Sequence, residues 1–244
     1  MPVNYNGRMN LGEKIIEGER IITSGQEVIG LEKVSMGYLS GQEVLRDITL
    51  SVGRGEFHFL SGASGAGKSS LLNIMALSLR PSKGSMRLFG QETTGLAREA
   101  LPPLRRRVGT VFQDYRLIDH LTIEENVGLP LKIAGEPKRQ IAEKVGELLE
   151  WVGLGAYHKA RPEILSGGQK QRAAIARAVI TAPDILLADE PSGNLDSALR
   201  LKFMYLFQTL HKGGTTIVLA THDDTLISMF DYPVMRLKDG RLVR

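Results

Sequence analysis

The sequence GASGAGKSS, residues 62–70, follows the apolar stretch EFHFLS (56–61) and runs into SSLLNIMALSL (69–79), which has the apolar spacing of a helix. It matches the pattern G-x-x-x-x-G-K-[ST] in the order of strand, loop and helix that this pattern requires. Glycines allow backbone amides to curve around a phosphate, and the start of a helix adds positive potential. The alternative is a glycine-rich turn that matches by chance. We predict a phosphate-binding loop formed by Ser64, Gly65, Ala66, Gly67, Lys68, Ser69 and Ser70.

Four side chains of this loop and of a second motif have expected roles. Lys68 would reach the β- and γ-phosphates of a nucleotide, and Ser69 would ligate Mg²⁺. The second motif, DILLADE (184–190), is an apolar strand that ends in Asp189 and Glu190. Asp189 is expected to hold Mg²⁺, and Glu190 to polarise the attacking water as a general base. The alternative is that two acids simply end a strand in solvent.

The stretch LSGGQKQRAAIARA (165–178) predicts a helix with two unexplained glycines at its start. Ser166 and Gln169 have the spacing of a capping box, in which side chains satisfy the free amides of the first turn. Gly167 and Gly168 are not explained by capping, and each costs roughly 0.5–1 kcal/mol relative to alanine. We therefore expect another group to approach the backbone closely at this point.

Three single residues are weaker candidates. Gln113 follows the strand RVGTVF (107–112) and could ligate Mg²⁺ or the attacking water, or be a loop residue. His222 follows TTIVLAT (215–221) and could hydrogen-bond the γ-phosphate, or be structural. Tyr38 could stack on an adenine ring, as aromatic side chains stack on bases elsewhere, or belong to the core. The remaining histidines are expected to be structural: His58, His120, His158 and His211.

The chain pattern predicts an α/β domain. From about residue 28 short apolar strands alternate with helical patterns, which indicates a largely parallel sheet. The stretch KRQIAEKVGELLEWVGL (138–154) has one apolar face at helical spacing. Residues 114–164 lack a clear strand and predict a helical region. Residues 1–27 are polar and are interpreted as an N-terminal extension, with Met9 as an alternative start.

The composition argues against several classes of protein. An apolar fraction of 42% and a charged fraction of 24% are typical of a soluble globular protein, and the lack of cysteine excludes disulfides. The net charge of +4 gives little support to nucleic-acid binding. No apolar run approaches the roughly 18 residues of a membrane span, and the N-terminus does not resemble a signal peptide. The arginines at 105–107 are interpreted as a solvated face, or alternatively as a contact for an acidic partner or lipid headgroups.

In this order, the motifs resemble those of the ATP-binding cassette (ABC) family over nearly all of residues 28–244. The resemblance implies a P-loop ATPase fold with a mainly parallel core sheet, an antiparallel β region and a helical subdomain at about 114–164. LSGGQ (165–169) is specific, because other P-loop folds lack it, and it argues against a phosphotransferase. The resemblance assigns adenine stacking to Tyr38, the Walker A loop to 62–70, the Q-loop to Gln113, the Walker B acids to Asp189 and Glu190, the D-loop to SGNLD (192–196) and the switch to His222.

The resemblance also implies how the protein works. In this family the LSGGQ sequence of one copy closes on the γ-phosphate of ATP held by the other copy, so a head-to-tail homodimer encloses two ATP molecules. It makes Ser166, Gly167, Gly168 and Gln169 a second phosphate cradle and adds Asp196 to the nucleotide site. The catalytic residues so implied are Glu190, His222 and Gln113, and the Mg²⁺ ligands are Ser69, Gln113 and Asp189.

Within the family, four stretches resemble the cell-division ATPases more than the lipoprotein-release or macrolide-export ATPases. FQDYRLI (112–118) is the most telling, because the other relatives usually lack Asp114. This finer resemblance implies an FtsX-like polytopic membrane partner, a location at the cytoplasmic face of the inner membrane, and indirect control of peptidoglycan hydrolases. The alternatives are an export ATPase, a scaffold that rarely hydrolyses ATP, and a nucleic-acid ATPase. The four stretches are residues 57–72, 80–90, 109–131 and 187–196.

Overall fold

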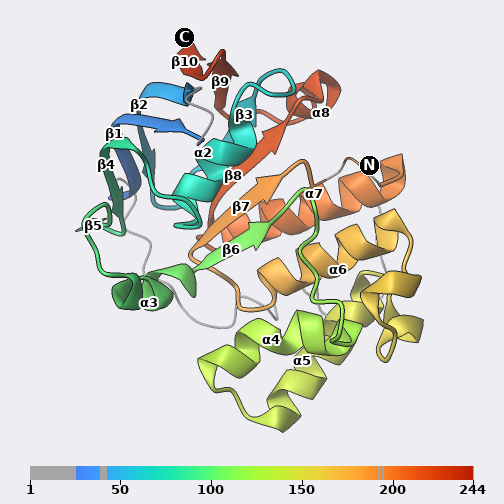
Figure 1. Ribbon diagram of the computed structural model, residues 1–244. Helices are drawn as coiled ribbons and strands as arrows, with labels where there is room; N and C mark the ends of the chain where they lie inside the picture. The colour runs from blue at the N-terminus through green and yellow to red at the C-terminus, as the bar shows by residue number, and fades with distance from the viewer. Residues whose placement is uncertain (1–25, 39–42, 192, 194, 244) are drawn as a thin grey trace.

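The structure is a computed structural model that describes residues 26–38, 43–191, 193 and 195–243 (Figure 1). The predicted N-terminal extension lies outside the described residues except for Gln26 and Glu27, and Glu27 is already the first residue of a strand. The strands form one sheet of six and one of four. The predicted α/β fold, with a mainly parallel core sheet and an antiparallel region, is therefore confirmed.

The six-stranded sheet has the order β10-β9-β3-β8-β7-β6. Its strands are parallel except for β10, which pairs antiparallel with β9. The central strands β7 and β8 are buried along their whole length, which explains why their sequences are continuous apolar runs rather than alternating patterns. The bounds are β3 Phe57–Ser61, β6 Val108–Val111, β7 Ile185–Asp189, β8 Thr216–Thr221, β9 Val234–Lys238 and β10 Arg241–Val243.

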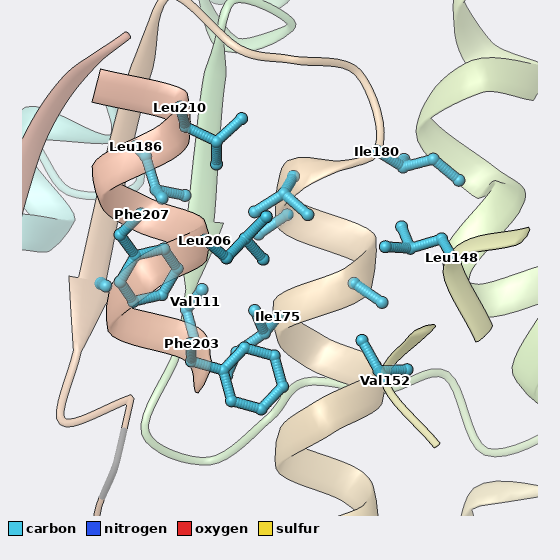
Figure 2. Packing of buried hydrophobic residues seen from close by; sticks show 14 of the residues in the cluster. Val111, Leu148, Val152, Ile175, Ile180, Leu186, Phe203, Leu206, Phe207 and Leu210 are labelled. Atoms are coloured by element: carbon cyan, nitrogen blue, oxygen red, sulfur yellow. The ribbon is translucent and has the colours of Figure 1, made fainter. Parts of the chain in front are cut away.

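Alternate residues of the central strands point to opposite faces and so build two hydrophobic cores. Leu186 and Ala188 of β7 join a core made with α4 to α7, while Ile185 and Leu187 join a core made with the antiparallel sheet and α2. Figure 2 shows the first of these cores between α6 and α7. The helices on this side are α4 Ile123–Ala134, α5 Lys138–Trp151, α6 Gly167–Val179 and α7 Ser197–Lys212.

The antiparallel sheet has the order β2-β1-β4-β5 and packs over the second core. Its apolar residues close over α2, so the helix that follows the 62–67 loop lies between the two sheets (Figure 1). This arrangement buries Leu71, Ile74 and Met75 of α2 completely. The bounds are β1 Glu27–Gly37, β2 Glu43–Gly53, β4 Lys83–Leu88, β5 Gln91–Glu92 and α2 Lys68–Met75.

The described structure from residue 114 to residue 164 contains α4, α5 and two short 3-10 turns, and no strand. The predicted apolar face of α5 is confirmed, because Val145, Leu148 and Leu149 are buried against α4 and α6. Asn126 in α4 is completely buried and ties the preceding loop to this helix. Its carboxamide oxygen accepts the Ile118 N–H at 2.7 Å.

The arginines at 105–107 are exposed, as predicted, but two of them also have fixed partners. Arg105 at the end of α3 (Leu101–Arg105) donates to the Leu77 carbonyl at 2.6 Å. Arg107 pairs with Asp184 at 2.8 Å and lies over the Phe89 ring. Among the described residues, no helix has both the length and the apolar character needed to cross a bilayer.

Candidate active site

The loop from Gly62 to Gly67 joins β3 to α2, as predicted. Three of its glycines have positive φ angles: Gly62 (155°), Gly65 (80°) and Gly67 (106°). A Cβ on Gly62 would lie 2.3 Å from the Leu237 carbonyl oxygen, and one on Gly67 would lie 2.9 Å from Leu45 Cδ2. Two of these glycines are therefore required by close packing as well as by backbone conformation.

Lys68 is the first residue of α2 and is buried. Its ammonium donates to the carbonyls of Gly62 at 2.7 Å and Ala63 at 3.2 Å, so the side chain folds back onto the loop that precedes it. It also lies 3.8 Å from Oε1 of Glu190. The structure thus brings the predicted phosphate-binding cation beside the predicted general base.

Tyr38 follows β1 and stands over the start of α2. Its hydroxyl lies 3.2 Å from Oγ of Ser70, yet 52% of the residue is exposed. Tyr38 is therefore not a core residue, and the alternative interpretation of this tyrosine is wrong. An exposed aromatic ring held beside the phosphate-binding loop is suited to stacking on a base.

Asp189 ends β7 and is buried, and its Oδ1 atom meets no hydrogen-bond donor among the described residues. Burial raises the pKa of this carboxyl, a hydrogen bond with Ser69 opposes that rise, and the neighbouring charge of Glu190 adds to it. A buried carboxylate with an unused oxygen next to a serine hydroxyl is a favourable place for a hard cation such as Mg²⁺.

Glu190 has a φ of 48°, in the left-handed region that residues other than glycine rarely adopt. Such a conformation costs about 1–3 kcal/mol and persists only where the surroundings impose it. The Glu190 N–H donates to the Ala220 carbonyl at 2.9 Å. One carboxylate oxygen lies 2.7 Å from Nδ1 of His222, and the other accepts the Thr221 hydroxyl at 3.3 Å. Both oxygens of the carboxylate therefore have fixed neighbours.

His222 follows β8. Its side chain is 71% exposed although Nδ1 contacts Glu190. An accessible imidazole at the carboxyl edge of the sheet can reach a ligand. Gln113 is exposed after β6, and the charge of the adjacent Asp114 contributes to the raised pKa of Asp189. The predicted Mg²⁺ ligand Gln113 thus follows a strand at the same edge of the sheet.

The LSGGQ sequence forms the start of α6. The predicted capping box is confirmed: Ser166 Oγ accepts the Gln169 N–H at 3.3 Å, and the Gln169 carboxamide accepts the Ser166 N–H at 2.8 Å. A Cβ on Gly167 would lie 3.3 Å from the Tyr115 hydroxyl. Among the described residues, no hydrogen bond or ion pair joins residues 166–169 to the loop at 62–70 of the same chain.

Asp196 caps α7, because its Oδ1 atom accepts the Leu199 N–H at 2.9 Å. Ser192 and Asn194 of the predicted D-loop lie outside the described residues. Gly193, between them, lines a cavity of about 380 Å³ together with Glu190 and His222. Gly193 therefore lies next to the predicted catalytic pair.

Comparison with known proteins identifies the family. A family model described as ABC transporter matches residues 45–193. The chain belongs to the ABC transporter family. The cell division ATP-binding protein FtsE of Escherichia coli (strain K12) is 44% identical over 215 residues, which cover 88% of this chain and 97% of that protein. FtsE of Streptococcus pneumoniae serotype 2 (strain D39) is 38% identical over 217 residues, 89% of this chain and 94% of that one.

A solved ABC structure has the same fold. The ATP-binding cassette MJ0796, in a dimeric post-hydrolysis state bound to ADP and Pi, is 35% identical and superposes with a TM-score of 0.84. The match covers 88% of this chain and 97% of that chain. The prediction that the chain is an ATPase of the ABC type is confirmed by these relationships.

Two residues of this ABC site were not predicted from the sequence. The Thr221 hydroxyl hydrogen-bonds one carboxylate oxygen of Glu190, and the Tyr115 hydroxyl would lie 3.3 Å from a Cβ on Gly167. A threonine at the end of an apolar strand and a tyrosine in a loop carry no signal of their own. Only the parallel pairing of β7 with β8, and the packing of the 113–118 loop on α6, bring them to the site.

Proposed function

We propose that this ABC ATPase binds ATP with Mg²⁺ between two copies of the chain and hydrolyses it there. In each copy Tyr38 stacks on the adenine, and the amides of residues 64–70 hold the phosphates. Lys68 turns from the Gly62 and Ala63 carbonyls to the β- and γ-phosphates. The start of α6 from the other copy, Ser166 to Gln169, closes on the γ-phosphate, with Asp196 at the edge of the interface.

Mg²⁺ fits the residues that the sequence assigns to it. Ser69, Asp189 and Gln113 offer hydroxyl, carboxylate and amide oxygens, which are the ligands this ion prefers. The unused oxygen of the buried Asp189 carboxyl offers a ligand position for such a cation. When bound, the ion would help to neutralise the charge that develops on the phosphates during hydrolysis.

The observation that carries the catalytic proposal is the geometry of Glu190. Its carboxylate lies 3.8 Å from Lys68 and 2.7 Å from His222 on a strained backbone at the end of β7. A carboxylate fixed between a phosphate-binding lysine and an accessible histidine is suited to take the proton of the attacking water. His222 would then contact the γ-phosphate from the same side.

The test is Glu190→Gln, which keeps the side-chain size and removes the base. We expect ATP binding to persist and turnover to fall about 10²–10⁴-fold, the usual range for losing a general base. The ATP-bound variant is expected to sediment as a dimer and to return to monomer when the nucleotide is removed. The exposed Glu99→Gln is the control. Normal hydrolysis by Glu190→Gln would exclude the assignment.

We further propose that the cassette serves cell division at the cytoplasmic face of the inner membrane. Identity of 44% to E. coli FtsE along nearly the full length of that protein supports this role. Closure of the dimer would act on an FtsX-like polytopic membrane protein and, through it, on peptidoglycan hydrolases or their activators. The surface that passes on the motion is expected to be Gln113 and the segment 114–127 after it.

Purification of Glu190→Gln from membranes in ATP tests this role. A single polytopic protein with a large extracytoplasmic domain, together with division-site hydrolase factors, would support it. Lipoproteins or a drug-export assembly in its place would move the function to export and leave the catalytic assignments unchanged.

A further inference from the structure

We infer that Arg200 is a positioning residue for ATP hydrolysis, which orients Glu190 and His222 through Asp223. The inference rests on the proposed roles of Glu190 and His222. The contact that carries it joins Nη1 of Arg200 to Oδ2 of Asp223 at 2.6 Å. This is a short hydrogen bond between two charged groups, the class that is shortest and strongest in proteins.

Arg200 belongs to the first turn of α7. Its backbone N–H donates to the carbonyl of Asp196 at 2.9 Å, so it is fixed directly to the end of the D-loop segment. Only 34% of its side chain is exposed, and its Nε atom is buried without an acceptor among the residues that the structure describes. The guanidinium is thus partly buried and hydrogen-bonded to Asp223.

Asp223 is held at three points. Its Oδ2 atom accepts from Arg200, its Oδ1 atom accepts the Leu226 N–H at 3.0 Å, and its own N–H donates to the Thr221 hydroxyl at 3.1 Å. It also begins α8 (Asp224–Ser228), for which it is the N-cap. Asp223 is therefore joined by its carboxylate to Arg200 and to α8, and by its backbone N–H to Thr221, the residue before His222.

The network ends on the predicted general base. Thr221 donates to Oε2 of Glu190 at 3.3 Å, and Nδ1 of His222 lies 2.7 Å from Oε1. Arg200 and Asp223 line the same cavity of about 380 Å³ as Glu190 and His222. A shift of α7 at Arg200 is thus passed through Asp223 to both oxygens of the Glu190 carboxylate. The Arg200 side chain bonds to Asp223, so its effect on Glu190 is indirect.

The test is steady-state ATP hydrolysis by the full chain carrying Arg200→Gln, measured at a temperature where the variant is fully folded. Misplacement of a catalytic group by about 1 Å can cost about a hundredfold, so we expect kcat to fall about ten- to a hundredfold. KM for ATP is expected to change less than about twofold, because the nucleotide contacts lie elsewhere. Arg200→Lys keeps the cation and should recover part of kcat.

Four further variants complete the experiment. Asp223→Asn retains the cap of α8 but weakens the pair, so the double variant Arg200→Gln/Asp223→Asn should lose no more activity than either single one. Arg139→Gln is the matched control. Arg139, like Arg200, pairs with a carboxylate, in this case that of Glu143, but its side chain is 90% exposed on α5. Glu190→Gln, assayed in parallel, tests the proposed function itself.

The outcomes separate the two hypotheses. Loss of kcat in Arg200→Gln with KM and folding retained, and recovery in Arg200→Lys, would support the positioning role. Unchanged kcat would overturn it, as would a loss that follows the folded fraction alone. If Glu190→Gln is inactive and Arg200→Gln is normal, only this inference fails. If Glu190→Gln is fully active, the assignment of the general base fails first.

Discussion

The hydroxyl of Tyr115 lies 3.3 Å from the position that a Cβ atom on Gly167 would occupy. Tyr115 has a left-handed backbone with φ of 60°, and Arg177 of α6 donates to its carbonyl at 2.7 Å. The segment after Gln113 and the helix that begins with LSGGQ are therefore in contact at two points. The tight space beside residue 167 therefore has a cause inside the chain, apart from the proposed approach of a nucleotide.

Gly167→Ala is expected to disturb this contact. A methyl group there requires the Tyr115 hydroxyl or the start of α6 to shift by a few tenths of an ångström. Where neither can shift freely, overpacking typically costs about 1–3 kcal/mol. The start of α6 is the proposed γ-phosphate cradle, so its displacement is expected to disfavour the closed dimer. A change of one or two kcal/mol in that closing equilibrium is a factor of about 5–30, and ATP turnover should fall accordingly. ATP affinity of the monomer should not change, because the 62–70 loop is not altered.

Tyr115→Phe in the Gly167→Ala background removes the crowded atom and should restore part of the turnover. Gly95→Ala is the control, since a Cβ there would meet no atom within 4 Å. If the double variant is no better than Gly167→Ala, the effect of the methyl arises at the nucleotide side and not at Tyr115.

Asn126 is expected to be the most sensitive polar residue of the helical region. Its amide donates to the carbonyls of Ile118, Leu121 and Thr122 at 3.0, 3.2 and 3.0 Å, and the side chain is fully buried. Asn126→Asp replaces this donor with an oxygen that faces three carbonyl oxygens. Each buried group left unpaired costs about 1–3 kcal/mol, so the free energy of unfolding in denaturant should fall by several kcal/mol.

Thr122→Ala provides the comparison for Asn126. It removes only the side-chain cap of α4, which is typically worth about 1 kcal/mol. Equal losses for Thr122→Ala and Asn126→Asp would show that the buried amide contributes no more to stability than an exposed cap.

The sequence predicted the strand ends that carry the site. Lys68 follows β3 through the 62–67 loop, Asp189 ends β7, and His222 follows β8. Parallel pairing of β3, β8 and β7 brings these strand ends to one edge of the sheet. This followed from local patterns, because a strand that is buried on both faces reads as a continuous apolar stretch. The capping box at Ser166 was equally local.

The features of the site that the sequence did not predict depend on contacts between distant parts of the chain. Arg200 and Asp223 are 23 residues apart, and nothing in either stretch indicates that they meet. Tyr38 was ambiguous for the same reason, since its exposure is decided by how β1 packs over α2. The partners of Arg105 and Arg107 were missed because three adjacent arginines resemble a solvated face in any sequence.

Two glycines within helices of the helical region are expected to respond differently to alanine. Gly146 is inside α5, and a Cβ there would touch only His158 Cε1 at 4.0 Å. Gly128 is inside α4, where a Cβ would lie 3.0 Å from Ile141 and 3.2 Å from Val145. Both substitutions gain about 0.5–1 kcal/mol of helix propensity, but only Gly128→Ala must also crowd the α4–α5 contact. Thermal unfolding should show Gly146→Ala as more stable than the parent and Gly128→Ala as clearly less stable than Gly146→Ala. Equal stabilisation by both substitutions would mean that the α4–α5 contact adjusts to the added methyl group without cost.

His211 is expected to make the protein less stable as the pH falls below about 6.5. Its ring packs edge-on against Phe57 and Tyr232, and its Nδ1 atom is buried without a partner among the described residues. Burial lowers the pKa of this histidine from its ordinary value of 6.5, a hydrogen bond with the Thr215 backbone opposes the shift, and Lys212 adds to it. Although His211 lies near the end of α7, where the helix dipole favours a cation, burial prevails.

The sign of the effect follows from this lowered pKa. A histidine that resists protonation in the folded protein binds more protons when unfolded, so stability is lost as the pH falls through the unfolded value. His211→Leu removes this titration and keeps an apolar group beside Phe57. As the pH is lowered from 7.5 to 5.5, the parent should therefore lose unfolding free energy relative to the variant, by no more than about 1.4 kcal/mol per pH unit. Denaturant unfolding at several pH values measures this difference, with His120→Leu, at an exposed histidine, as the control. A difference that stays constant with pH would mean that His211 is protonated equally in the folded and unfolded chains.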